Sequence, residues 1–130
     1  MGVLGGFQAR CLRNILRIRP SYTSLASNKT VLEKAQQQPF TTQLLQQQLL
    51  LYGKVGREED GNLLRDITFC PHSLRAATDR YIRRTGRPRN EWTKQVWKVA
   101  MGIARDKPLE ELVASAAAWE IMVRKYCSSL

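Results

Sequence analysis

The residues best suited to binding a ligand lie in the segment 83–92, whose sequence is Arg-Arg-Thr-Gly-Arg-Pro-Arg-Asn-Glu-Trp. Pro88 fixes its own φ angle and favours an extended conformation at Arg87, and Gly86 permits a sharp bend. Such a segment does not belong in a core, so its guanidinium groups project outward, where they can bind phosphate through paired hydrogen bonds. The spacing therefore predicts an exposed basic loop that contacts a polyanion.

The whole chain carries a strong positive charge. Its 130 residues contain 21 Lys+Arg against 11 Asp+Glu, which gives a formal net charge of +10. A field of this sign attracts polyanions, and nucleic acid is the default partner. No apolar run approaches the roughly 18 residues that a membrane-spanning helix requires, so we expect no membrane span.

The positive charge is concentrated in two blocks. Residues 1–39 sum to +5, 40–70 to −1, 71–107 to +7 and 108–130 to −1. Two basic blocks separated by a nearly neutral stretch predict two contact points on a nucleic acid. The candidate nucleic-acid-binding residues are Arg10, Arg13, Arg17 and Arg19 in the first block, and Arg80, Arg83, Arg84, Arg87, Arg89, Lys94 and Lys98 in the second.

The first basic block is expected to be helical. Over residues 4–18 the apolar positions recur at helical spacing, and this predicts a buried side made of Phe7, Cys11, Ile15 and Ile18. The arginines of this helix then fall on the opposite, exposed side. A short helix should follow, started by a cap at Ser27 or, in competition with it, at Thr30.

The middle of the chain alternates helices and breaks. A helix is predicted from Thr41 or Thr42 to about Val55, and the acidic run 58–62 is typical of a turn. Residues 63–69 are expected to be extended or to form a short strand, which Pro71 ends. Ser73 is then a candidate cap for a helical stretch over 74–84.

The last third is predicted to be a helical hairpin. Asn90 is a good cap for a helix with Val96 on its apolar side, and Pro108 suits the first turn of the next helix. An apolar seam along that second helix ends in Trp119, Val123 and Tyr126. The seam could dock on a partner protein or close the protein's own core, and Trp92 and Trp97 could likewise stack on bases or pack inward.

These elements together predict an all-α protein of about five helices with one short extended segment. It would be a small helical domain with an extended basic loop. We expect an N-terminal helical segment over 1–57, a linker with the arginine-rich loop over 58–90 and a C-terminal helical hairpin over 91–130.

The cysteines do not indicate a disulfide framework or a metal centre. Cys11, Cys70 and Cys127 are odd in number and far apart, which fits a reducing compartment. His72 is the only histidine, and Cys-Pro-His lacks the paired spacing of structural zinc sites. We therefore predict no metal site and no cofactor.

Four short motifs in the same order resemble a known family. They are FxxRCLRxILxI at 7–18, SNxxVLxxA at 27–35, GRPRxxW at 86–92 and WxxxVRKYC at 119–127. The sequence is similar to the region that follows the polymerase in non-LTR retrotransposon reverse transcriptases, over nearly the whole chain. That resemblance implies a tail that helps to hold template RNA or target DNA.

The chain departs from that family where catalysis would occur. A reverse transcriptase holds two metal ions with paired aspartates, and no Asp-Asp pair is present here. The endonuclease and the zinc knuckle often found in the family are also missing. The sequence thus predicts no enzyme activity, and we expect a stand-alone small protein recruited from the noncatalytic tail.

The expected function is that of a non-catalytic RNA-binding structural component of a ribonucleoprotein, specifically a mitochondrial ribosomal protein. Its partners would be ribosomal RNA and neighbouring proteins of a large assembly. No acidic residue precedes Glu33, and arginines and hydroxyl groups are present, as in matrix-targeting segments, so we expect location in the mitochondrial matrix. Two alternatives stay open: an accessory protein-binding subunit of a mitochondrial complex, or a DNA-binding module whose Gly-Arg-Pro core resembles an AT-hook.

Overall fold

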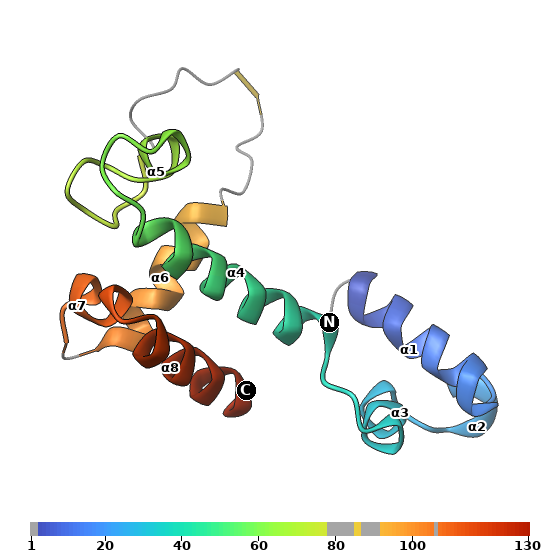
Figure 1. Cartoon of the computed structure of the whole chain (residues 1–130). Coiled ribbons are helices and arrows are strands. Elements are labelled where there is room, and N and C mark those ends of the chain that lie inside the picture. Colours follow the sequence, from blue (N-terminus) through green and yellow to red (C-terminus); the bar gives the residue numbers. More distant parts are fainter. Residues whose placement is uncertain (1–2, 78–84, 87–91, 106) are drawn as a thin grey trace. The chain divides into compact units, whose positions relative to one another are not determined.

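The protein is all-α, as predicted. The computed structural model describes residues 3–77, 85–86, 92–105 and 107–130, and over these residues it has eight helices and no strand (Figure 1). More helices are present than the expected five because three of them are only four to six residues long. The helices are α1 (Val3–Leu16), α2 (Ser21–Ser24), α3 (Asn28–Ala35), α4 (Phe40–Gly56), α5 (Leu63–Thr68), α6 (Trp92–Ala104), α7 (Leu109–Ala114) and α8 (Ala116–Ser128).

The chain divides into two compact units, Met1–Leu45 and Gln46–Leu130. The division falls inside α4, whereas the sequence suggested a boundary after residue 57. The later half of α4 belongs to the second unit because its side chains are buried against residues that follow in the sequence. Each unit has its own buried residues and is described by itself.

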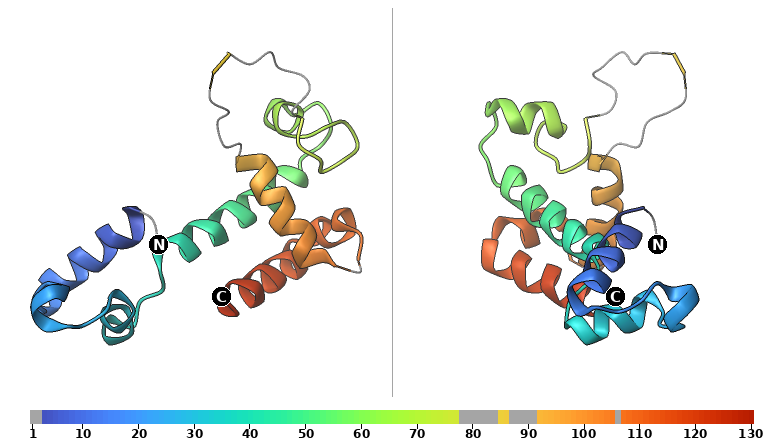
Figure 2. Two further views of the ribbon diagram at one scale, coloured as in Figure 1. Left: turned by 180° about the vertical axis from the view of Figure 1, so that it is seen from behind. Right: turned by 90° about the vertical axis from the view of Figure 1, so that its right-hand side faces the viewer.

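The first unit is built on the contact between α1 and α3. Its buried residues are Gly5, Gln8, Ala9 and Arg13 from α1, and Val31 and Leu32 from α3. Figure 2 shows these helices from two further sides. Gly5 and Ala9, one helical turn apart on this side of α1, are small, and the separation of packed helices depends on the side chains at the contact.

The predicted buried side of α1 is wrong. Phe7 is 55% exposed and Ile15 is 74% exposed, while Cys11 and Ile18 are only half-buried. The helix instead buries Gln8, whose Nε2 donates to Gln38 O at 2.8 Å and whose Oε1 accepts from Phe40 N at 2.7 Å. Both polar groups of this amide have partners, so its burial carries little desolvation penalty.

The helix starts in this unit follow local capping chemistry. Ser27 caps α3, because its Oγ accepts a hydrogen bond from Thr30 N at 3.2 Å, and it therefore prevails over the alternative start at Thr30. Gln36 ends α3 in the left-handed conformation, with φ 53°. The next helix, α4, begins directly after Pro39 and ends at Gly56, close to the predicted bounds.

The core of the second unit is centred on three aromatic side chains. Trp119 of α8 is 1% exposed and donates from Nε1 to Leu49 O of α4 at 2.8 Å. Tyr52 is also buried, and its hydroxyl donates to Leu74 O at 2.6 Å. The Tyr52 and Phe69 rings meet edge to face, with centroids 5.1 Å apart, a favourable arrangement for aromatic pairs.

Close packing of Trp119 on α4 depends on a glycine. A Cβ built at Gly53 would overlap Cδ1 and Nε1 of the Trp119 indole. Gly53 lies one helical turn after Leu49, the residue whose carbonyl accepts the indole hydrogen bond. The absence of a side chain at position 53 therefore creates the space in which the indole ring lies.

The predicted extended segment or short strand over residues 63–69 is wrong for residues 63–68, which form helix α5. Asn62 caps the helix, and its Oδ1 accepts from Leu64 N at 3.0 Å and from Arg65 N at 3.4 Å. Extended backbone begins only at Phe69, which forms an isolated bridge with Ala76.

The stretch after this bridge differs from the predicted helix over 74–84. Residues 74–77 are not helical, and the Ser73 hydroxyl instead accepts from Arg75 N at 2.9 Å. The remainder of that prediction, residues 78–84, lies outside the described residues, as does the predicted cap Asn90. Ser115 separates α7 from α8, so the expected apolar seam runs over two helices.

None of the described helices is long and apolar enough to cross a membrane.

Replacing Gly53 by Ala should destabilise the second unit, because the new methyl group would push against a buried ring. The matched control is Gly102→Ala in α6, where a Cβ meets nothing within 4 Å. We expect Gly53→Ala to lower the free energy of unfolding by about 1–3 kcal/mol, and Gly102→Ala to raise it by about 0.5–1 kcal/mol through helix propensity. Urea unfolding followed by tryptophan fluorescence measures both. Equal changes in the two variants would contradict the close packing at Gly53.

Candidate nucleic-acid interface

The first basic block has an exposed part and a buried part. Arg10 is exposed on α1, and Arg17 and Arg19 are exposed just after it. These three side chains are available to a polyanion. Arg13 is not, since it is 8% exposed and its guanidinium group points into the first unit.

The placement of Arg13 among the exposed arginines is therefore wrong. Its Nη1 donates to Arg19 O at 3.1 Å, and its Nη2 donates to Ala26 O at 2.5 Å and to Asn28 Oδ1 at 3.3 Å. These bonds tie α1 to the connection that leads into α3. Helical periodicity did not reveal this role, because the acceptors are mainly main-chain groups whose positions depend on tertiary structure.

The second basic block is described in part. Lys94 and Lys98 are exposed on α6, one helical turn apart, while Val96 between them is buried. Trp92 is partly exposed and Trp97 is half-buried. The predicted basic side of this helix thus faces outward. Arg80, Arg83, Arg84, Arg87 and Arg89 lie outside the described residues.

Gly86 adopts a backbone conformation that favours glycine. Its φ is 140°, in a region that residues with a Cβ rarely adopt. Thr85 and Gly86 are both exposed. The bend predicted at this glycine is therefore present.

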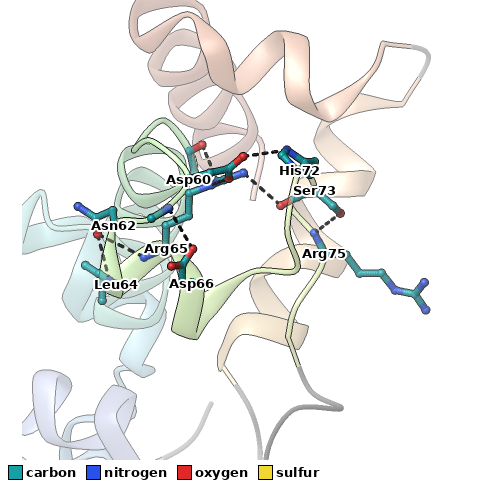
Figure 3. Close-up of polar contacts among 10 residues, drawn as sticks. Asp60, Asn62, Leu64, Arg65, Asp66, His72, Ser73 and Arg75 are labelled. Carbon is teal, nitrogen blue, oxygen red and sulfur yellow. Dashed lines mark hydrogen bonds and ion pairs between the residues drawn. The ribbon is translucent and has the colours of Figure 1, made fainter.

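A second buried arginine, Arg65, was not anticipated from the sequence. Its Nε donates to Asp60 Oδ1 at 3.0 Å, its Nη1 to Gly56 O at 2.8 Å and its Nη2 to Ser73 O at 3.5 Å. His72 Nδ1 lies 2.8 Å from the other carboxylate oxygen of Asp60. Figure 3 shows Arg65 and His72 on either side of this carboxylate. Two local features of the sequence could have indicated that Arg65 is structural. Asn62 is a suitable helix cap just before it, and Phe69, whose ring Arg65 lies over, follows four residues later.

The Asp60–Arg65–His72 cluster holds the two ends of the α5 region together. The hydrogen bond from Arg65 lowers the pKa of Asp60, and the charges of His72 and Arg65 act in the same direction. A cavity of about 460 Å³ lies beside this cluster. Arg57 and Glu110 also line it, so charges of both signs meet there and the cavity has no strong preference for an anion.

The predicted protein-docking seam is largely internal. Trp119 and Val123 are buried in the second unit, and only Tyr126 is half-exposed. The alternative that this seam closes the protein's own core is therefore correct for Trp119 and Val123. Apolar residues spaced three and four apart are expected on a helix side that packs in the protein's own core and also on one that docks on a partner. The sequence therefore could not distinguish the two interpretations.

The three cysteines are free thiols. Among the described residues, no group of three or more histidine, cysteine, aspartate or glutamate side chains is placed to hold a metal ion.

Comparison with known proteins identifies no relative. No family model matches the chain, and neither a curated protein nor a solved structure is significantly similar to it.

Replacing Arg13 by Gln should destabilise the first unit, because at least two main-chain carbonyls lose a charged donor. Hydrogen bonds to charged groups contribute roughly 1.5–3 kcal/mol each, so we expect the unit to be destabilised by at least that amount. Arg10→Gln is the control, since Arg10 is exposed on the same helix. Hydrogen exchange at the buried residues Val31 and Leu32 reports on this unit. Similar exchange in both variants would contradict the internal role of Arg13.

Acid should weaken the Asp60 cluster. The pKa of Asp60 is lowered in the folded protein, so its contribution to stability is present above the pKa of the unfolded chain and is lost as pH falls through the folded value. Asp60→Asn should lower the urea midpoint at neutral pH and flatten its decline toward acidic pH. Glu58→Gln, which changes an exposed acid in the same loop, should leave the decline intact. The assignment fails if both variants give the same pH profile.

Proposed function

We propose that this chain is a non-catalytic RNA-binding structural component of a ribonucleoprotein. The observation that carries the proposal is the exposure of Lys94 and Lys98 on the outer side of α6. This helix follows directly on the arginine-rich segment, whose sequence predicts outward-facing guanidinium groups. A basic helix side next to a basic loop offers successive charges to one phosphate backbone.

The first unit provides a second contact in this proposal. Arg10, Arg17 and Arg19 are exposed, and Glu33 is the only acidic residue before the end of that unit. Exposed arginines in a unit that carries a single acidic residue are available to bind phosphate oxygens. Two units that each bind RNA would suit a structural subunit more than a sequence reader, because phosphate contacts position a protein and carry no sequence information.

The specific assembly we propose is the mitochondrial ribosome, with ribosomal RNA and neighbouring proteins as partners and the matrix as compartment. The acid-free first 32 residues and the amphipathic α1 support this location. The ordered motifs that resemble the tail of a non-LTR retrotransposon reverse transcriptase support an origin in a nucleic-acid-holding segment. The sequence lacks the paired aspartates of the polymerase, so we propose no activity for the chain itself.

The two alternatives differ in their support. An accessory protein-binding subunit would dock through the apolar seam of α8. Little of that seam is accessible to a partner, because Trp119 and Val123 are buried. A DNA-binding module would use Gly86 and its flanking arginines in the narrow minor groove of A·T tracts. The bend at Gly86 is compatible with either nucleic acid, so competition between RNA and DNA decides between them.

Binding of the full chain to a structured RNA should weaken steeply with salt. Replacing Arg84, Arg87 and Arg89 by Ala should make the slope of log K against log salt shallower by roughly one unit for each phosphate that is no longer neutralised. The control replaces Lys54, Lys107 and Lys125 by Ala, which removes the same charge at other exposed positions. Fluorescence anisotropy at several salt concentrations measures the slopes.

Three results would count against the proposal. A salt-insensitive interaction would exclude phosphate contacts as its basis. An equal change of slope in the control would assign the effect to net charge rather than to the arginine-rich segment. Preference for an A·T-rich duplex over structured RNA in direct competition would favour the DNA-binding alternative.

A further inference from the structure

The exposed side of α1 is both apolar and bordered by arginines. Leu4, Phe7, Cys11 and Ile15 recur at spacings of three and four residues, so they form one stripe along the helix. Phe7 is 55% exposed and Ile15 is 74% exposed, while Cys11 is half-buried. We call these four residues the α1 stripe. A continuous apolar surface of this kind indicates an interaction site.

The rotation of α1 that exposes this stripe is fixed by internal hydrogen bonds. Gln8 bonds to Gln38 O and to Phe40 N, and Arg13 bonds to two main-chain carbonyls. Turning the helix to bury Phe7 and Ile15 would remove both buried polar side chains from their partners. These hydrogen bonds therefore hold α1 in the orientation that leaves the α1 stripe outward.

Charge restricts what can cover the stripe. Arg10 is exposed on the same helix, Arg17 is exposed directly after its end, and no acidic residue precedes Glu33. The second unit contains fifteen basic and ten acidic residues, so its net charge is also positive. A second copy of the chain carries the same net charge of +10, which opposes its approach to a stripe bordered by arginine.

We propose that α1 is a docking surface for an anionic lipid bilayer, on which it lies flat. A polynucleotide would pair with Arg10 and Arg17 but would leave Phe7 and Ile15 in water. An anionic bilayer satisfies both features, because apolar side chains enter the headgroup boundary while arginines pair with lipid phosphates. The helix is 14 residues long and is presented by a folded unit, so the association is peripheral.

This inference is separate from RNA binding by the second unit. Chain bound to vesicles through α1 should still bind RNA through Lys94, Lys98 and the arginine-rich segment. Failure of one proposal therefore leaves the other standing. Arg10 and Arg17 are the residues that both proposals use.

Co-sedimentation of the full chain with lipid vesicles tests the proposal. Vesicles of phosphatidylcholine mixed with phosphatidylglycerol should bind the chain, and phosphatidylcholine alone should bind it much less. Replacing Ile15 by Ser should reduce binding to the anionic vesicles at least about tenfold, because the side chain no longer contributes apolar burial. Ile121→Ser is the matched control, since Ile121 is 65% exposed on α8 and should leave binding unchanged.

A second pair of variants separates charge from apolar contact. The double variant Arg10→Gln, Arg17→Gln should lower the ratio of binding to anionic over neutral vesicles by about fivefold for each arginine replaced. The double variant Lys107→Gln, Lys125→Gln should preserve this ratio. Hydrogen exchange at Val31 and Leu32 shows whether the first unit remains folded in each variant. Absence of vesicle binding, equal binding to neutral and anionic vesicles, or equal reductions in the Ile15 and Ile121 variants would each overturn the proposal. Absence of vesicle binding would favour an acidic protein surface as the partner that covers the α1 stripe.

Discussion

The packing of one indole ring on a glycine fixes how α8 lies against α4 in the second unit. Trp119 lies against α4 where Gly53 has no side chain, and its Nε1 bonds to the carbonyl of Leu49 one turn earlier. This interaction joins two helices through residues 70 positions apart in sequence. Tyr52 extends it, because its ring lies near Trp119 and its hydroxyl bonds to Leu74 O. Burial raises the pKa of Tyr52, so the hydroxyl stays protonated and remains a donor.

Elsewhere in the protein, buried polar side chains fix how the elements pack. Gln8 and Arg13 hold the first unit together, and Arg65 holds the loops around α5. Each of them bonds to main-chain oxygens that no helix or strand would satisfy. Leaving such carbonyls unpaired in a buried position is costly. These residues therefore determine how loops and helices meet, where apolar contacts alone would allow several arrangements.

The sequence was sufficient for the fold class and for the elements whose signals are local. The cap at Ser27 and the break at Pro39 place α3 and the start of α4, and periodic apolar positions place α6. The buried side of α1 and the helical state of α5 were missed. In α1 the decisive partners of Gln8 and Arg13 lie up to 32 residues away. In α5 the Asn62 cap outweighed the β-branched and apolar letters that suggested a strand.

The same distinction separates residues that bind from residues that fold. Among the predicted contacts, Arg10, Arg17, Arg19 and Lys98 are exposed, so a ligand can use them without disturbing either core. Arg13 has the same side-chain chemistry as the exposed arginines, but its guanidinium group is committed to main-chain oxygens. Charge counted along a sequence cannot separate the two cases, because the difference lies in acceptors supplied by tertiary structure. The number of basic residues therefore gives an upper bound on the number of cations available to a polyanion, and burial decides how many of them remain.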